Sequence, residues 1–170
     1  MYFLRIYDKM WKKGDVKKVY LEKFLEQYKN KKVKMFVDMD GVIADFNFGE
    51  AHNFDKKRPL YSSISKLENI SKKDNVDLYI FSATRMNKGY DEKQYWLDKY
   101  APFFKKENRV IISRAKHDFL ESSELKADYM KNIERDGSVL IVIDDDPKNL
   151  RAIRKLNDDV VLLKDTALID

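Results

Sequence analysis

The chain has 170 residues, of which 44% are apolar and 13% aromatic, which suits one domain with a sizeable core and argues against disorder. It contains no cysteine, which excludes disulfides, thiolate zinc sites and thiol redox chemistry. Its longest apolar runs, such as VLIVI at 139–143, are far shorter than the roughly 20 residues of a membrane span, so we expect a cytoplasmic protein without a membrane partner.

The net charge of +5 is concentrated near the N-terminus. Residues 12–34 contain nine lysines and three acidic residues, a local charge of +6, so the rest of the chain carries about −1. Such a segment is either a surface that attracts phosphates or a solvated, lysine-rich helix face, and the second interpretation is the commoner one.

The first predicted elements are two short helices. Gly14 and Asp15 supply a helix stop and a helix cap. An apolar stripe typical of one helix face then recurs every fourth residue, at Val16, Tyr20, Phe24 and Tyr28. We therefore interpret residues 1–33 as a helical extension that packs on a main domain of residues 34–170.

From residue 34 the pattern changes to alternating strands and helices. Apolar runs typical of buried strands lie at about 34–38, 77–81, 109–112, 139–143 and 159–163. Helical patterns lie between them, at about 60–73, 90–100, 124–135 and 147–156. This alternation predicts an α/β fold, a Rossmann-like three-layer sandwich with a mostly parallel five-stranded sheet.

Polar residues follow these predicted strands, at the edge where ligands bind in such sheets. They are Asp38, Asp40 and Gly41 in KMFVDMDGVIADF, Ser82 to Arg85 in FSATR, Ser113 and Arg114, and Asp144 to Asp146 in DDDP. Taken singly, such a residue is usually a cap for the next helix, and Asp146 before Pro147 has that pattern. Their coincidence at one edge predicts a functional site.

Four of these residues suggest a metal. If the first and fourth strands are neighbours, four carboxylates converge, those of Asp38, Asp40, Asp144 and Asp145. Such a cluster is unfavourable without a cation, and a site with only oxygen ligands suits Mg²⁺.

The motifs DMDGVIADF, FSATR, a downstream lysine and VIDDDP, in that order on alternating strands, resemble those of the haloacid dehalogenase-like (HAD) phosphohydrolases. The resemblance spans residues 34–163. Two stretches are also similar to the 5'(3')-deoxyribonucleotidases, VDMDGVIADF and DEKQYWLDKYAPFFKKENRVIISRAK at residues 91–116. The resemblance implies a Mg²⁺-dependent phosphatase that hydrolyses phosphomonoesters.

The resemblance also implies roles for single residues. Asp38 attacks phosphorus and forms an aspartyl-phosphate, Asp40 acts as acid and then as base, and Ser82 donates a hydrogen bond to a phosphoryl oxygen. A lysine balances the charge of the nucleophile and the phosphate. Mg²⁺ is held by Asp38, the main-chain carbonyl of Asp40, Asp144 and, directly or through water, Asp145.

Two lysines are candidates for the charge-balancing role. Lys126 opens the helical pattern before the fourth strand, where the superfamily usually has it, and Lys116 lies in the nucleotidase-like phrase ISRAK. We favour Lys126, because the start of a helix that feeds the fourth strand has a fixed position relative to the site. Further candidate substrate contacts are Gly41, Thr84, Arg85, Arg114 and Lys116, although ion pairs at the surface are the usual role of such basic side chains.

The chain departs from the nucleotidase pattern after the first motif. Only about fourteen residues, 45–58, stand where those relatives have a helical cap, which predicts a minimal cap and an open site. Nucleotides are the favoured substrates, with a polynucleotide 3'-phosphatase and a phosphate-binding module without turnover as alternatives. Phe46, Phe48 and Phe54 either stack on a base or close the core, and closing the core is favoured.

Overall fold

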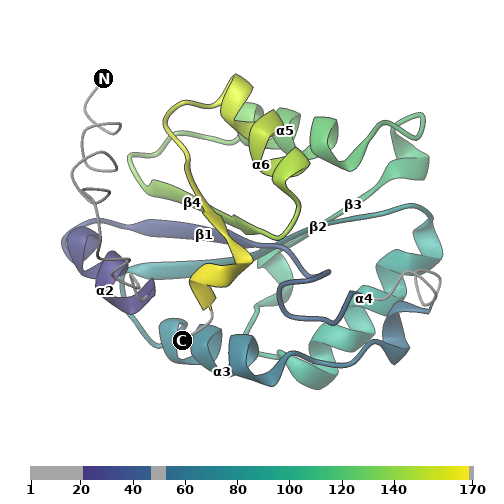
Figure 1. The fold of residues 1–170 in the computed structure, drawn as a ribbon, viewed down its shortest axis with the longest axis horizontal. Helices are drawn as coiled ribbons and strands as arrows, with labels where there is room; N and C mark the ends of the chain where they lie inside the picture. Colours follow the sequence, from purple (N-terminus) through teal and green to yellow (C-terminus); the bar gives the residue numbers. More distant parts are fainter. Residues whose placement is uncertain (1–20, 47–52, 169–170) are drawn as a thin grey trace, which may run out of the picture.

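The structure is a computed structural model that describes residues 21–46 and 53–168. Five parallel strands form one sheet in the order β3-β2-β1-β4-β5, with helices on both faces (Figure 1). The strands are β1 (Val33–Val37), β2 (Val76–Thr84), β3 (Arg109–Ser113), β4 (Val139–Asp144) and β5 (Val161–Lys164). The helices are α2 (Leu21–Leu25), α3 (Tyr61–Ile70), α4 (Asn87–Tyr100), α5 (Ser122–Asn132) and α6 (Pro147–Leu156). The predicted Rossmann-like α/β fold is confirmed.

Strand β1 lies at the centre of the sheet and is buried on both faces. It pairs with β2 on one side and with β4 on the other, so Val37 lies beside Ile80 and Ile143. Side chains alternate along a strand, and Met35 and Val37 accordingly join one hydrophobic cluster while Phe36 joins the other. Burial on both faces explains why β1 is a continuous apolar run in the sequence.

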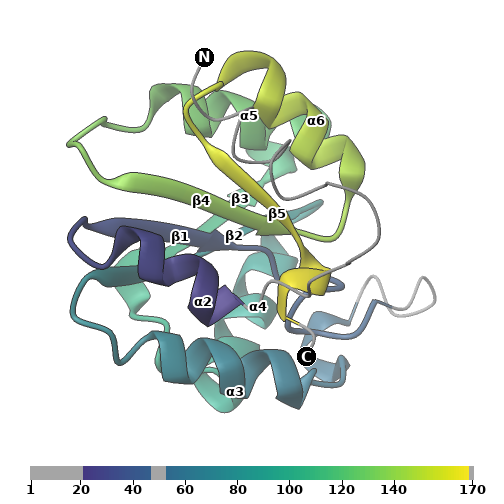
Figure 2. The ribbon, with the colours of Figure 1, turned by 60° about the vertical axis from the view of Figure 1, so that its left-hand side comes forward.

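Each face of the sheet is covered by its own helices (Figures 1 and 2). Helices α5 and α6 pack together on one face, and α2, α3 and α4 lie on the other. From α2, Leu21 and Leu25 are buried in the main core, so this part of the N-terminal segment packs on the sheet, as expected. Val16 and Tyr20 lie outside the described residues, and a domain boundary at residue 33 stays a prediction.

The carboxyl ends of β1, β2 and β4 meet at one edge of the sheet. The polar residues that follow these strands are therefore neighbours, although the sequence separates them widely.

Beyond β4, the side chain of Asp146 accepts a hydrogen bond of 2.8 Å from the Lys148 amide and Pro147 opens α6, which confirms the predicted helix cap. Within the described residues, no helix is long and apolar enough to cross a membrane.

The stability of the fold should depend strongly on Phe36. Its ring is fully buried and stacks on that of Tyr79, with centroids 4.7 Å apart. We expect Phe36→Ala to lower the free energy of unfolding by about 3–5 kcal/mol, because the cavity left in the core does not close. Tyr95→Ala, at a side chain that is 61% exposed, should change it by less than about 0.5 kcal/mol. Urea unfolding followed by circular dichroism measures both, and equal losses would contradict the assignment of the core.

Candidate active site

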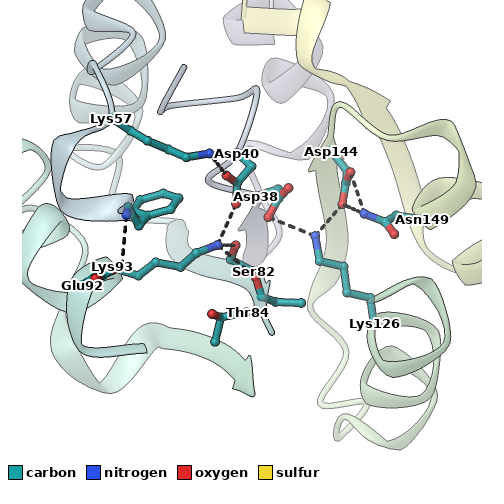
Figure 3. Close-up of polar contacts among 12 residues, drawn as sticks. Asp38, Asp40, Lys57, Ser82, Thr84, Glu92, Lys93, Lys126, Asp144 and Asn149 are labelled. Carbon is teal, nitrogen blue, oxygen red and sulfur yellow. Dashed lines mark hydrogen bonds and ion pairs between the residues drawn. The ribbon is translucent and has the colours of Figure 1, made fainter. Parts of the chain in front are cut away.

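Three carboxylates converge where β1 and β4 end. Asp38 follows β1 and Asp144 is the last residue of β4, as Figure 3 shows, and Asp145 follows Asp144 in the chain. Each of the three offers an oxygen atom within 4.8 Å of the others, and Asp38 and Asp144 are buried. An all-oxygen set of this size fits Mg²⁺, which takes a few carboxylates and keeps several waters. The convergence follows from the pairing of β1 with β4.

Lys126 reaches this cluster from α5 and is 1% exposed. Its Nζ lies 3.0 Å from Asp38 Oδ1 and 2.7 Å from Asp144 Oδ2. Burial acts to lower the pKa of Lys126, but the two carboxylates outweigh it and raise that pKa above its ordinary value, so the lysine is charged. Burial raises the pKa of Asp38, and Asp144 and Asp40 act in the same direction while Lys126 opposes them.

The carboxylate of Asp144 is held by two further donors. Asn149, in the first turn of α6, donates its side-chain amide to both oxygens, at 3.1 and 3.0 Å. The backbone amide of Asp146 donates to Oδ1 at 2.8 Å. Together with Lys126 these donors fix the orientation of the buried Asp144 carboxylate, so that its oxygens keep their position beside those of Asp38 and Asp145.

Asp40 faces two other lysines, on the side of the site away from Lys126 (Figure 3). Lys93 Nζ, from α4, lies 2.7 Å from Asp40 Oδ2, and Lys57 Nζ lies 2.5 Å from Oδ1. Burial acts to raise the pKa of Asp40, but the ammonium groups of Lys93 and Lys57 outweigh it and hold that pKa at about 2. Asp40 is therefore ionised in the free protein.

Lys93 also sets the direction of the Ser82 hydroxyl. Its Nζ lies 2.7 Å from Ser82 Oγ and 3.0 Å from the carbonyl oxygen of Ala83. Because an ammonium group can only donate, Ser82 Oγ is the acceptor in this contact. The hydroxyl proton of Ser82 is left to point at a different acceptor, and Ser82 lines the cleft described next.

Apart from Asp144, the residues described above line an open cleft of about 690 Å³. Thr84 and Arg85 also line it, and Arg85 is exposed and has no polar partner within the described part of the chain. Arg114 lies in the cleft wall and donates hydrogen bonds to the carbonyls of Leu120 and Phe119. Lys116 lies in the wall of another cavity, of about 430 Å³, so it is Lys126 that lies among the carboxylates.

Gly41 makes room for Asp145. Its φ of +70° is in the left-handed region, and a Cβ placed there would lie 2.1 Å from Asp145 Oδ2. Only glycine satisfies both conditions. Gly41 is not among the residues that line the cleft, so its contribution to the site in this structure is this close approach.

The phenylalanines after the first motif have different surroundings. Phe54 is buried, and its ring centroid lies 5.9 Å from that of Trp96 on α4, so it closes the core, as favoured. Phe46 is 49% exposed and lines the cleft. Phe48 lies outside the described residues, as does all of 47–52, and the minimal cap therefore stays a prediction.

Three residues of the site were not predicted from the sequence: Lys57, Lys93 and Asn149. The burial of Lys93 could have been predicted, because it shares a helix face with the buried residues Trp96 and Leu97, three and four positions further along the chain. A lysine on a buried helix face needs an anion. Lys57 precedes α3 in an irregular segment, where no periodic pattern marks it, and Asn149 resembles any polar residue in a first helical turn.

Comparisons with known proteins bear on the fold. No protein-family model matches the chain, and no curated protein matches it in sequence. A chain of the Pnkp1/Rnl/Hen1 RNA repair complex has a TM-score of 0.60 and 13% identity, over 79% of this chain and 42% of that one. A second structure of the Pnkp1/Rnl/Hen1 complex gives 0.61 and 14%, over 78% and 46%.

A third similar structure is that of D,D-heptose 1.7-bisphosphate phosphatase from B. bronchiseptica, complexed with magnesium and phosphate. Its TM-score is 0.53 at 14% identity, over 81% of this chain and 95% of that one. The chain spans less than half the length of the two chains from the RNA repair complex. The likeness is one of fold.

Removal of the Lys126 ammonium group should destabilise the protein, and added Mg²⁺ should offset part of the loss in unfolding free energy. In EDTA we expect Lys126→Met to lower the free energy of unfolding by about 3–5 kcal/mol, because Asp38 and Asp144 then remain buried without a cation. Excess Mg²⁺ should restore part of this stability in urea unfolding. Lys131→Met, at an exposed position of the same helix, is the control and should stay near wild type. A Lys126→Met protein as stable as this control would contradict the electrostatic account.

The metal-free protein should lose stability as pH rises through the titration of Asp145. Burial, with the charges of Asp38 and Asp144, raises the pKa of Asp145 to about 7 in the folded state, whereas an unfolded aspartate releases its proton near about pH 4. Between these values the folded state binds more protons, so the unfolding free energy falls as pH rises.

The measurement is urea unfolding in EDTA from pH 4 to pH 8. Asp145→Asn should be increasingly more stable than wild type toward pH 8, and the two should converge near pH 4. The control Asp128→Asn, at an exposed position of α5, should run parallel to wild type. Parallel curves for wild type and Asp145→Asn would show that Asp145 has an ordinary pKa.

Proposed function

We propose that the protein is a Mg²⁺-dependent phosphatase of the HAD-like type that hydrolyses phosphomonoesters. The observation that carries this proposal is the position of Asp38 and Asp40 after the central strand, each beside its own lysines. Lys126, which contacts Asp38, also contacts Asp144. These two aspartates form, with Asp145, the cluster that suits Mg²⁺. The D,D-heptose 1.7-bisphosphate phosphatase, whose fold is similar, was solved in complex with magnesium and phosphate.

In the first step a carboxylate oxygen of Asp38 attacks phosphorus, and the bond from phosphorus to the leaving oxygen breaks. The leaving oxygen takes a proton from Asp40, and the phosphoryl group stays on Asp38 as an aspartyl-phosphate. In the second step Asp40 accepts a proton from water, whose oxygen attacks phosphorus, and Asp38 is released as a carboxylate with inorganic phosphate.

The surroundings of Asp40 suit the second step directly, since the free protein holds it as a carboxylate. The first step needs a proton on Asp40. An anionic substrate supports this form, because its charge opposes that of Lys57 and Lys93 and so raises the pKa of Asp40. Ser82, whose oxygen accepts a hydrogen bond from Lys93, donates a hydrogen bond to a phosphoryl oxygen, and Lys126 keeps Asp38 oriented.

Mg²⁺ would be held by Asp38, Asp144, Asp145 and the main-chain carbonyl of Asp40. It would neutralise charge on the phosphoryl group. The donors present fit this ion, because all of them are oxygens and three carboxylates already lie close together. Two of these carboxylates, Asp38 and Asp145, line the open cleft.

Nucleotides are the substrates we propose first. The cleft is open, with a half-exposed aromatic ring, Phe46, and a cation without a partner in the described residues, Arg85, in its wall. The former can stack on a base and the latter can bind a phosphate. The resemblance of residues 91–116 to nucleotidases also supports nucleotides as the substrate class. We propose the cytoplasm as the location, because a chain without cysteine suits a reducing compartment.

A polynucleotide 3'-phosphatase is the second candidate. The open cleft gives room for a strand end, and similar folds occur in a complex of RNA repair. The third interpretation, a phosphate-binding module without turnover, is disfavoured by the pair Asp38 and Asp40, because binding alone does not need both.

A phosphate-release screen tests the function. We expect release from nucleotides or from phosphorylated oligonucleotides with Mg²⁺ and none in EDTA. Asp38→Asn should lower the rate at least about a thousandfold, because it removes the nucleophile. Asp45→Asn, at an aspartate paired with the exposed Arg58, is the matched control and should keep the rate within about twofold.

Two outcomes of this screen decide between the candidates. Release from oligonucleotide ends that weakens steeply with salt favours the polynucleotide enzyme, because each neutralised phosphate releases counterions. Full activity in Asp38→Asn, or no release from any substrate, would show that the protein is not this phosphatase.

A further inference from the structure

Lys57 and Lys93 bring more positive charge to the cleft than the nearby acids neutralise. Their side chains are 2% and 4% exposed, and both ammonium groups contact the same carboxylate, that of Asp40. Two buried cations thus share one anion. Within the described residues no second carboxylate pairs with either lysine, and an unneutralised buried charge is costly.

Glu92 does not supply the missing charge, although it lies in the same wall of the cleft. One of its oxygens accepts the Phe54 amide at 3.1 Å, and the other lies 3.0 Å from Lys88 Nζ. Both oxygens of its carboxylate are therefore engaged by donors other than Lys57 and Lys93.

Lys57 has hydrogen-bond donors to spare. An ammonium group carries three N–H bonds, and those of Lys93 have three acceptors, on Asp40, Ser82 and Ala83. Lys57 Nζ has one acceptor among the described residues, Asp40 Oδ1. Its other neighbours are the rings of Phe54 and Phe46, with centroids at 5.0 and 5.3 Å. These rings stabilise the charge, but two N–H bonds remain without an acceptor oxygen in the part of the chain that the structure describes.

The backbone holds Lys57 in this place. Trp96, which is fully buried on α4, donates its indole N–H to the Lys57 carbonyl at 2.9 Å. The Lys57 amide donates to the carbonyl of Phe54 at 3.1 Å, closing a short helical turn. Lys57 is therefore a desolvated cation at a fixed position in the cleft wall, the arrangement that binds an anion at low cost in conformational entropy.

We infer that Lys57, supported by Lys93, binds a second phosphate group of the substrate. This rests on the proposed function, in which the phosphate to be cleaved lies on the Asp38 side and the leaving group lies toward Asp40. The substrate is then a phosphomonoester whose leaving group carries another phosphate. Two sources share this chemistry, a small bisphosphate and a strand end in which a phosphodiester adjoins the terminal phosphate.

The test is calorimetric binding in EDTA, where a Mg²⁺-dependent phosphatase does not turn over. The ligands are uridine 3'-monophosphate, uridine 3',5'-bisphosphate and a uridine dinucleotide with a 3'-phosphate. In wild type we expect the second phosphate to tighten binding at least about tenfold. Tightening by the bisphosphate identifies a small-molecule substrate, and tightening by the dinucleotide alone identifies a strand end.

Lys57→Met should reduce the affinity ratio between the doubly and singly phosphorylated ligands to about one. The ratio is the readout, because an effect of Lys57 on the position of Asp40 acts on all three ligands alike. Arg58→Met removes a cation from the same segment, but its side chain is 85% exposed and paired with Asp45, and it should keep the wild-type ratio. If Lys57→Met is unfolded by circular dichroism, Lys57→Gln takes its place with the same expectation.

A ratio near one in wild type, or a ratio unchanged in the Lys57 variant, would overturn the inference even if phosphate is released with Mg²⁺. A high ratio that depends on Lys57 supports the subsite. If such a protein released no phosphate from any substrate, the proposed function would fail while the second phosphate site would stand.

Discussion

Lys126 carries a positive charge into the interior of the protein, where the carboxylates of Asp38 and Asp144 meet it. The sheet makes this cation necessary. β1 and β4 are parallel neighbours in register, with Val37 beside Ile143, so the aspartates that follow these residues lie side by side. Two carboxylates that lie side by side in the protein interior repel each other, and this raises the free energy of the folded state unless a cation lies between them. Lys126 supplies that cation at 3.0 and 2.7 Å.

The site has a second electrostatic half around Asp40. Asp38 and Asp40 are two residues apart in the chain, yet Asp38 contacts the lysine of α5 while Asp40 contacts the lysines of α4 and of the segment before α3. The two carboxylates thus have different environments, which suits the roles of nucleophile and acid/base group that we propose for them. Lys93 joins this half to the hydroxyl that we propose binds phosphate, since it contacts Asp40 and Ser82 at once.

The sequence predicted one half of the site much better than the other. Asp38, Asp144 and Lys126 lie next to strong patterns, a buried strand or the start of a helix, and their convergence needs only the correct order of strands. Lys57 and Lys93 meet Asp40 from 17 and 53 residues away. No local pattern reports such a contact. A lysine in an irregular segment and a lysine on a helix both look like solvated surface residues until the partner is known.

By itself the sequence determined the class of fold, the order of strands and helices, and the edge of the sheet where the acids gather. Hydrophobic periodicity and helix caps act over a few residues, so short stretches of the sequence are enough to predict these features. Only the tertiary structure decided that Lys126, and not Lys116, lies among the carboxylates, and that two buried lysines share Asp40. The reason is that burial and charge pairing depend on segments far apart in the chain, which become neighbours only when α4 and the segment before α3 pack together.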